Sequence, residues 1–211
     1  ATPGDVGALG LLYQWGRKDP FMGASAIAEG TTTQAASTIG TWPAPVKSDN
    51  TTGSIDYAIG HPTTFIASND KTNDWYYSED GSADKSRWGS KKTIYDPCPP
   101  GYRVPDGGDE GVWVKASGGG VIEEEMDEDK SGYDITQFSD SAPVCWYPLT
   151  FGLQSGNGSL KLIGETSTYL SCTTAEDKAY CLTLSRFLLI EMWFGADRSD
   201  GHSVRCMKEN K

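Results

Sequence analysis

Aromatic and charged side chains crowd into one polar stretch, residues 74–88. The residues that we single out there are Asp74, Trp75, Tyr76, Tyr77, Arg87 and Trp88. Indole and phenol rings stack on the apolar faces of sugars, while neighbouring carboxylates and amides take the sugar hydroxyl groups. Because Trp75 and Trp88 have polar neighbours in the sequence, we predict that they are exposed members of a carbohydrate-binding site. Tryptophan is more often a core residue, and apolar neighbours assign three others to the core: Trp15, Trp146 and Trp193.

Signatures of the common enzyme classes are missing from the chain. It contains no G-x-S-x-G nucleophile elbow, P-loop, dinucleotide-binding fingerprint or H-E-x-x-H zinc motif. The two histidines, His61 and His202, stand alone and leave little room for a Ser-His or Cys-His pair. We therefore expect no catalytic residues and a protein that is not an enzyme.

Several loops are rich in carboxylates and are weak candidates for calcium binding. Calcium needs six to eight oxygen ligands that converge on one point, and the chain has no EF-hand spacing. We therefore predict no metal site and no cofactor, and leave calcium open as an alternative. The candidate ligands for that alternative are Asp106, Asp109, Asp197 and Asp200.

The stretch 91–105, KKTIYDPCPPGYRVP, carries four prolines and one cysteine. Proline fixes φ, removes a hydrogen-bond donor and favours extended conformations in the residue before it. We interpret the stretch as a rigid corner: a short strand at 93–95, a bend at Cys98 and an extended piece at 102–104. A second strand-like segment, 203–206, ends in Cys206. We predict a disulfide between Cys98 and Cys206 that ties the centre of the chain to its end.

Three further cysteines remain, and no C-x-x-C spacing of a zinc site is present. Cys172 and Cys181 flank an expected hairpin, 170–182, and either bond to each other or are buried thiols. Cys145, beside Trp146, is expected to be a buried free thiol.

Three blocks of the chain resemble the Fibrobacter succinogenes major paralogous domain. They are GLLYQWGRKDPF (10–21), KTIYDPCPPGYRVP (92–105) and GHSVRCMK (201–208). The resemblance implies the C-type lectin-like superfold, which formylglycine-generating enzymes also use, and surface or fimbria-associated proteins of Bacteroidota. It therefore implies a location outside the cell or at the outer-membrane surface. The Glu-Pro-Asn and Trp-Asn-Asp motifs of calcium-dependent C-type lectins are missing.

The periodicity of the chain predicts a helix at 8–15, because Leu11, Leu12 and Trp15 recur at helical spacing. A second short helix or strand is expected at 112–116. From residue 143 onward, β-branched and aromatic residues alternate with turn residues. The strands expected there are 144–151, 160–163, 168–172, 179–184, 188–194 and 203–207. We therefore predict an α+β fold with few short helices, long loops and antiparallel sheets concentrated in the C-terminal half.

Length and charge limit the function further. At 211 residues the chain is most simply one domain, residues 1–211, and we expect it to be the mature part or a fragment of a longer surface protein. The formal net charge of −11 comes without a basic stripe, which argues against a nucleic-acid partner. No apolar run is long enough to span a bilayer, so direct membrane insertion is not expected.

These observations predict a non-catalytic adhesion or carbohydrate-binding module, at a fimbrial tip or in a surface lipoprotein. Its partner would be a glycan or a protein of a host or bacterial surface. One alternative is a structural pilus-assembly domain that joins other fimbrial subunits and has no small ligand. A second alternative is an activity like that of formylglycine-generating enzymes, which use a cysteine pair; Cys172 and Cys181 would have to play that role.

Overall fold

The computed structural model describes residues 9–21, 43–69, 71–119, 122, 124–129, 131–135, 146–162, 164–187 and 190–209, without the side chains of Trp193 and Phe194. Within these ranges the fold is sheet-rich, and its two helices are short: α1 (Ile55–Gly60) and α2 (Val112–Ala116). This agrees with the predicted α+β class. Neither helix is long and apolar enough to cross a membrane.

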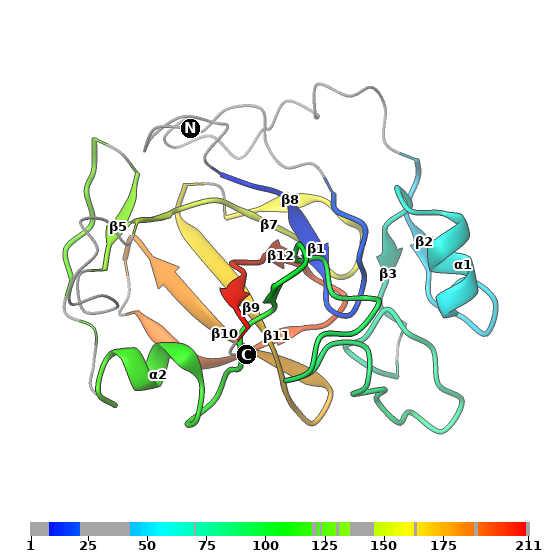
Figure 1. Cartoon of the computed structure of the whole chain (residues 1–211). Helices are drawn as coiled ribbons and strands as arrows, with labels where there is room; N and C mark the ends of the chain where they lie inside the picture. Colours follow the sequence, from blue (N-terminus) through cyan, green and yellow to red (C-terminus); the bar gives the residue numbers. More distant parts are fainter. Residues whose placement is uncertain are drawn as a thin grey trace.

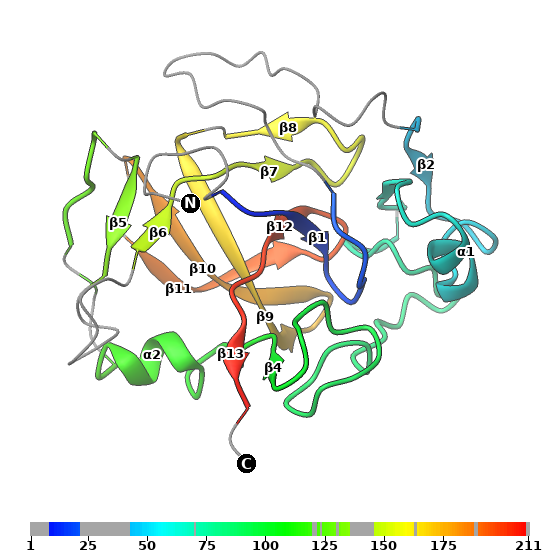
Figure 2. The same ribbon diagram turned by 45° about the horizontal axis from the view of Figure 1, so that its top comes forward.

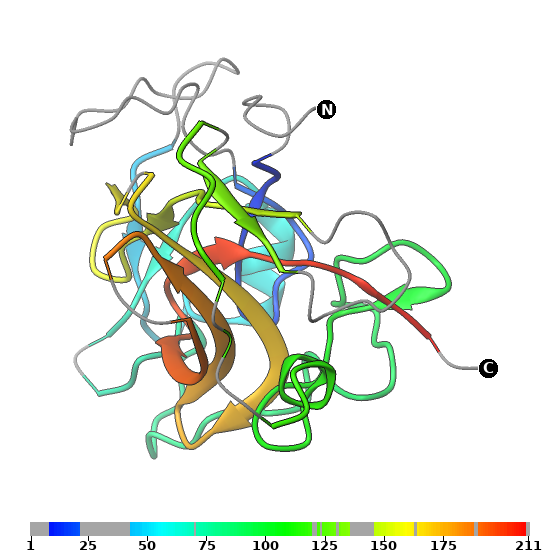
Figure 3. The ribbon, with the colours of Figure 1, turned by 90° about the vertical axis from the view of Figure 1, so that its left-hand side faces the viewer.

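The largest sheet of the described part has seven strands in the order β11-β10-β9-β12-β7-β8, with β1 also paired to β12 (Figure 1). These strands are β1 (Leu12–Gln14), β7 (Gly152–Leu153), β8 (Leu160–Lys161), β9 (Thr166–Ala175), β10 (Lys178–Ser185), β11 (Glu191–Asp197) and β12 (Gly201–Ser203). Three long antiparallel strands, β9, β10 and β11, form an up-and-down meander that curves strongly (Figure 3). The expected hairpin at 170–182 is confirmed as the β9–β10 pair.

Three small sheets complete the described fold. They join β2 (Val46–Lys47) to β3 (Ile66–Ala67), β4 (Tyr102–Arg103) to β13 (Met207–Lys208), and β5 (Gly132–Asp134) to β6 (Trp146–Pro148). Figure 2 shows β4 and β13 side by side below the large sheet, with α1 on the opposite side of the molecule from α2.

The N-terminal block forms a strand where a helix was expected, so the prediction of a helix at 8–15 is wrong. Gly10 has a φ of 76°, a left-handed conformation that a right-handed helix does not contain. Leu12 to Gln14 pair with β12, placing Leu12 opposite Ser203 and Gln14 opposite Gly201. The sequence 112–116, by contrast, forms the helix α2. The expected short strand at 93–95 is also wrong, because these residues lie in a turn.

The predicted disulfide is confirmed: Cys98 is bonded to Cys206, with 5.7 Å between the two Cα atoms. Asp96 organises the proline-rich corner beside it. Its Oδ1 accepts hydrogen bonds from Cys98 N–H and Lys92 Nζ, both at 2.8 Å, and its Oδ2 accepts one from Val104 N–H at 2.9 Å. The bond closes a loop of 108 residues, which stabilises the fold by about 4–5 kcal/mol through the entropy of the unfolded chain.

The core is divided into several clusters around the large sheet. Trp15 is fully buried, as expected, whereas Trp146 is half-buried. The side chain of Trp193 and the whole of Cys145 lie outside the described residues. One cluster fills the face of β9 and β10 that carries Tyr169, Leu182 and Leu184, and α2 covers part of it through Trp113. The opposite face of these strands therefore carries the alternate residues.

Candidate functional site

The predicted carbohydrate site at residues 74–88 is a buried structural cluster. Trp75 and Trp88 are 1% and 0% exposed, so the prediction that they present a ring face to a sugar is wrong. The indole of Trp75 donates to the carbonyl of Trp15 at 2.8 Å, and that of Trp88 donates to the carbonyl of Tyr95 at 2.9 Å. Hydrogen bonds to backbone carbonyls therefore hold both indole rings in the protein interior. Tyr76 and Tyr77 are half-buried.

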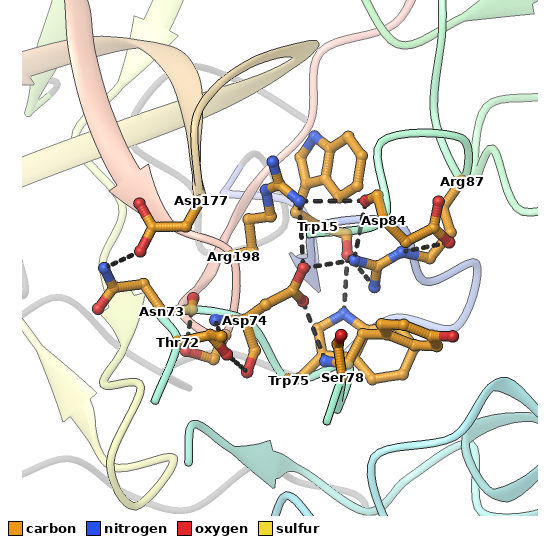
Figure 4. Close-up of polar contacts among 12 residues, drawn as sticks. Trp15, Thr72, Asn73, Asp74, Trp75, Ser78, Asp84, Arg87, Asp177 and Arg198 are labelled. Carbon is orange, nitrogen blue, oxygen red and sulfur yellow. Dashed lines mark hydrogen bonds and ion pairs between the residues drawn. The ribbon is translucent and has the colours of Figure 1, made fainter. Parts of the chain in front are cut away.

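Asp74 is the charge at the centre of this cluster, which Figure 4 shows in detail. Its Oδ2 lies 2.5 Å from Nη2 of Arg87 and 3.2 Å from Nη1 of Arg198. All three side chains are essentially inaccessible to water. Burying charged groups is costly unless they are paired and hydrogen-bonded. Asp74 therefore pairs with both buried guanidinium groups, while Asp84, 3.5 Å from Nε of Arg87, supplies a second carboxylate. Burial lowers the pKa of Arg198.

Aromatic rings hold the two guanidinium groups in place. The guanidinium carbon of Arg87 lies 5.0 Å from the ring centre of Trp15 and 4.6 Å from that of Trp75. That of Arg198 lies 4.7 Å from Trp15. Such cation–π contacts are favourable, the more so when water is excluded. We call Trp15, Asp74, Trp75, Arg87 and Arg198 the arginine–tryptophan cluster. Most of its polar groups bind one another or backbone carbonyls, whereas the buried Nε atoms of Arg87 and Arg198 have no hydrogen-bond partner among the described residues.

The cluster is joined to the turn 197–200, which leads into β12. Arg198 donates to the carbonyls of Asp84 at 3.1 Å and Glu176 at 2.7 Å. The backbone N–H of Ser199 donates to the carbonyl of Asn73 at 3.0 Å. These contacts fix the turn in place. Its first and last residues are Asp197 and Asp200.

Asp197 and Asp200 line a groove of about 460 Å³ on the large sheet. The lining residues come from β8, β9, β10, β11 and β12 of the large sheet and from the connections between them. They are Lys161, Leu162, Thr166, Thr168, Lys178, Thr183, Ser185, Glu191, Gly195, Ala196, Asp197, Asp200 and His202. We call this the sheet groove.

Alternation along the strands explains the polar lining. On β10, Leu182 and Leu184 enter the core, so Thr183 and Ser185 face the groove. Thr183 is opposite Thr168 on β9 and opposite Glu191 on β11. Two hydroxyl groups and one carboxylate therefore form a row across three adjacent strands.

The floor of the groove is an ionic network around Asp200. Its Oδ2 lies 2.7 Å from Nζ of Lys161 and 3.3 Å from Nε2 of His202, and its Oδ1 accepts the backbone N–H of Ser155 at 2.7 Å. Burial alone would raise the pKa of Asp200, but the hydrogen bond from His202 and the charge of Lys161 hold it at about 2. Asp200 is therefore an ionised carboxylate and no proton donor at neutral pH.

The rim of the groove contains both paired and unpaired polar groups. Lys178 and Asp197 form an ion pair of 2.9 Å, and the hydrogen bond that Lys178 donates to Asp197 raises the pKa of Lys178. The hydroxyl groups of Thr166 and Thr168 and the exposed carboxylate of Glu191 form no side-chain hydrogen bond or ion pair within the described part of the chain. These groups are available to a ligand.

An apolar side chain borders the same rim. Leu162 is 49% exposed. Its backbone φ is 53°, a value that residues other than glycine rarely adopt. Strained backbone of this kind is found preferentially at binding sites. The groove therefore offers an apolar contact beside its hydroxyl and carboxylate groups.

The two cysteines considered for catalysis or for a second disulfide are not bonded to each other. Cys172 and Cys181 are both buried thiols, and burial raises the pKa of each to about 12. Cys181 is opposite Leu170 across β9 and β10, and a bulge between Ala179 and Cys181 offsets it from Cys172. Neither lines the sheet groove. The arrangement gives no reactive thiolate at the base of a cleft.

Three of the four calcium candidates are bound to basic side chains. Asp106 pairs with Arg103, Asp197 with Lys178 and Asp200 with Lys161, while Asp109 is exposed. Among the described residues, no group of three or more metal-ligating side chains converges on one point. A cation at any of the three paired positions would have to displace a lysine or arginine.

Comparison with known proteins gives no relative on which to build. No family model matches the chain, and no curated protein or solved structure matches it. The resemblance to the Fibrobacter succinogenes domain thus stays a hypothesis based on the three sequence blocks. The function has to be argued from the sheet groove itself.

Proposed function

We propose that the chain is a non-catalytic carbohydrate-binding module that serves in adhesion at a cell surface, and that the sheet groove binds the ligand. The observation that carries this proposal is the set of unpaired polar groups in the groove: the hydroxyls of Thr166 and Thr168 and the carboxylate of Glu191. Unpaired hydroxyl and carboxylate groups in a groove are suited to a ligand that supplies many hydroxyl groups.

The chemistry of the groove matches that of a sugar. A threonine hydroxyl both donates and accepts, and a carboxylate accepts from two or more hydroxyls. Leu162 gives the apolar face of a sugar ring a surface to contact. A volume of about 460 Å³ lies within the usual range of small-ligand sites, about 300–1,000 Å³.

Three ionisable groups of the groove, Asp200, Lys161 and Lys178, are held in ion pairs. Asp200, with a pKa of about 2, does not donate a proton at neutral pH. These features favour binding over catalysis.

A location outside the cell is part of the same proposal. The Cys98–Cys206 disulfide supports it, because such bonds persist in oxidising compartments. The resemblance to surface and fimbria-associated proteins of Bacteroidota, with the C-type lectin-like fold that it implies, points the same way. The partner would then be a glycan on a host or bacterial surface.

A glycan-array screen of the purified chain, run with calcium and again with chelator, tests the proposal. We expect binding that Thr168→Val weakens at least tenfold, because the substitution removes one hydroxyl and preserves the shape. Thr63→Val is the matched control, since Thr63 is exposed and is not among the groove residues. An array without signal, or binding unaffected by Thr168→Val, contradicts the proposed site.

One observation favours a second candidate, a structural domain of pilus assembly. β11 lies at one end of the large sheet and, among the described strands, pairs only with β10. An edge strand can accept a strand from another subunit. For this candidate we expect a blank array and slow amide hydrogen exchange of β11 after addition of a partner subunit, with fast exchange in the isolated chain.

A further inference from the structure

The charged side chains of the sheet groove are not all paired with one another. Two of its positive charges are neutralised locally: Lys161 by Asp200 at 2.7 Å and Lys178 by Asp197 at 2.9 Å. Glu191 is the remaining carboxylate of the lining, is exposed, and has no ion pair within the described residues. Glu191 is therefore a negative charge of the groove that no basic side chain of the described residues pairs with.

Glu191 lies close enough to Thr168 and Thr183 to contact a ligand that binds these threonines. It is opposite Thr183, which in turn is opposite Thr168, so the carboxylate ends a row of hydroxyl groups across β9, β10 and β11. Residues directly opposite each other on neighbouring strands have Cβ atoms about 5 Å apart. A ligand of two or three rings that touches Thr168 therefore lies within reach of Glu191.

An ionised carboxylate accepts hydrogen bonds and donates none. It suits a ligand hydroxyl and repels a second carboxylate or a sulfate. An unpaired like charge is one means by which a binding site rejects a competitor.

The two lysines offer an acidic ligand little compensation. An anion would have to separate Lys161 from Asp200 or Lys178 from Asp197. Asp200 also receives the backbone N–H of Ser155 and the ring of His202, so its network is fixed from three sides. Releasing Lys161 would leave a carboxylate that is 9% exposed without its main counter-charge.

From these contacts, and resting on the proposed function, we infer that the sheet groove selects neutral saccharides and rejects acidic ones, and that Glu191 sets this selectivity. The ligand class is a neutral oligosaccharide whose hydroxyl groups bind Glu191 and the threonines. Saccharides that carry uronic acid or sulfate groups at the same position are excluded by charge.

The test compares matched pairs of ligands. Each neutral oligosaccharide on the array is paired with its counterpart in which the 6-hydroxymethyl group is oxidised to a carboxyl group, and binding is then measured in solution for the strongest pair. We expect the neutral member to bind at least tenfold more tightly at low salt. Glu191→Gln should reduce that ratio about tenfold, mainly by improving binding of the acidic member, and added salt should reduce it in the native chain.

Glu79→Gln is the matched control. It removes the same charge from another exposed glutamate that does not line the groove, and it should leave the ratio unchanged. Equal or tighter binding of the acidic members, or a ratio that Glu191→Gln leaves unchanged, overturns the inference while the carbohydrate-binding proposal stands. Failure of every saccharide to bind overturns both.

Discussion

The arginine–tryptophan cluster and the sheet groove contain similar kinds of residues and use them in opposite ways. In the cluster, Asp74 lies between Arg87 and Arg198, and the rings of Trp15 and Trp75 cover the guanidinium groups. Every member is buried. In the groove, two ion pairs are partly exposed, and two hydroxyls and one carboxylate are unpaired within the described residues.

The difference shows that the density of aromatic and charged residues does not by itself mark a binding site. Polar groups that satisfy one another stabilise a fold, whereas polar groups without internal partners are free to bind a ligand. The two regions meet at the turn 197–200, where Arg198 enters the cluster and Asp200 enters the groove. The cluster thus positions the groove.

Removal of the central carboxylate should have the largest effect on stability. Asp74→Ala removes the carboxylate that contacts both Arg87 and Arg198 and leaves them only the partly exposed Asp84, 3.5 Å from Nε of Arg87. Breaking a buried pair in this way costs about 3–5 kcal/mol. Urea unfolding of the variant and the native chain measures the difference. Asp80→Ala is a control, because Asp80 is a fully exposed aspartate in the same loop. A loss below about 1 kcal/mol would mean that the cluster does not stabilise the fold as its geometry indicates.

The local features of this chain could be predicted from the sequence. The bend of the proline-rich corner and the hairpin at 170–182 follow from residue types that act on their immediate neighbours. The Cys98–Cys206 bond spans 108 residues, but each cysteine could be recognised in an extended segment of its own. Strand 12–14 could not be predicted in this way. Its hydrogen-bonding partner is β12, nearly 190 residues further along the chain, and apolar residues at helical spacing gave the opposite prediction.

The sites were harder to predict for a related reason. The polar neighbours of Trp75 suggested exposure, but these neighbours include Asp74, which binds two buried arginines, one of them from residue 198. Thr168, Thr183 and Glu191 form one row only because of the register of three strands. The alternation of Leu182 and Leu184 with Thr183 and Ser185 was the available signal for a polar face on β10.

Acid should destabilise the groove network by a smaller amount. The pKa of Asp200 is lowered from 3.8 to about 2. A carboxyl group with a lower pKa in the folded chain stabilises it above the unfolded pKa, and this contribution is lost as the pH falls toward the folded value. At about 1.4 kcal/mol for each pH unit between the two values, the contribution is about 2 kcal/mol.

Urea unfolding of the native chain and of Asp200→Asn between pH 6 and pH 2 isolates this contribution. We expect the native chain to be more stable at pH 6 and the difference between the two chains to decrease below about pH 4. Asp109→Asn is the control, because Asp109 is exposed. A difference that does not change with pH would contradict the network of Asp200, Lys161 and His202.

The smallest effect on stability is expected from the groove residues that we assign to the ligand. Glu191 is exposed, so Glu191→Gln should change the free energy of unfolding by less than about 0.5 kcal/mol. Thr168 is buried, but its hydroxyl has no side-chain partner within the described residues, so Thr168→Val should change it by no more than about 1 kcal/mol. The same variants should change saccharide affinity about tenfold. Thermal unfolding and solution binding, measured on the same preparations, separate the two quantities. A loss of several kcal/mol on Glu191→Gln would place Glu191 among the structural residues, with Asp74, and would remove the distinction between the two regions.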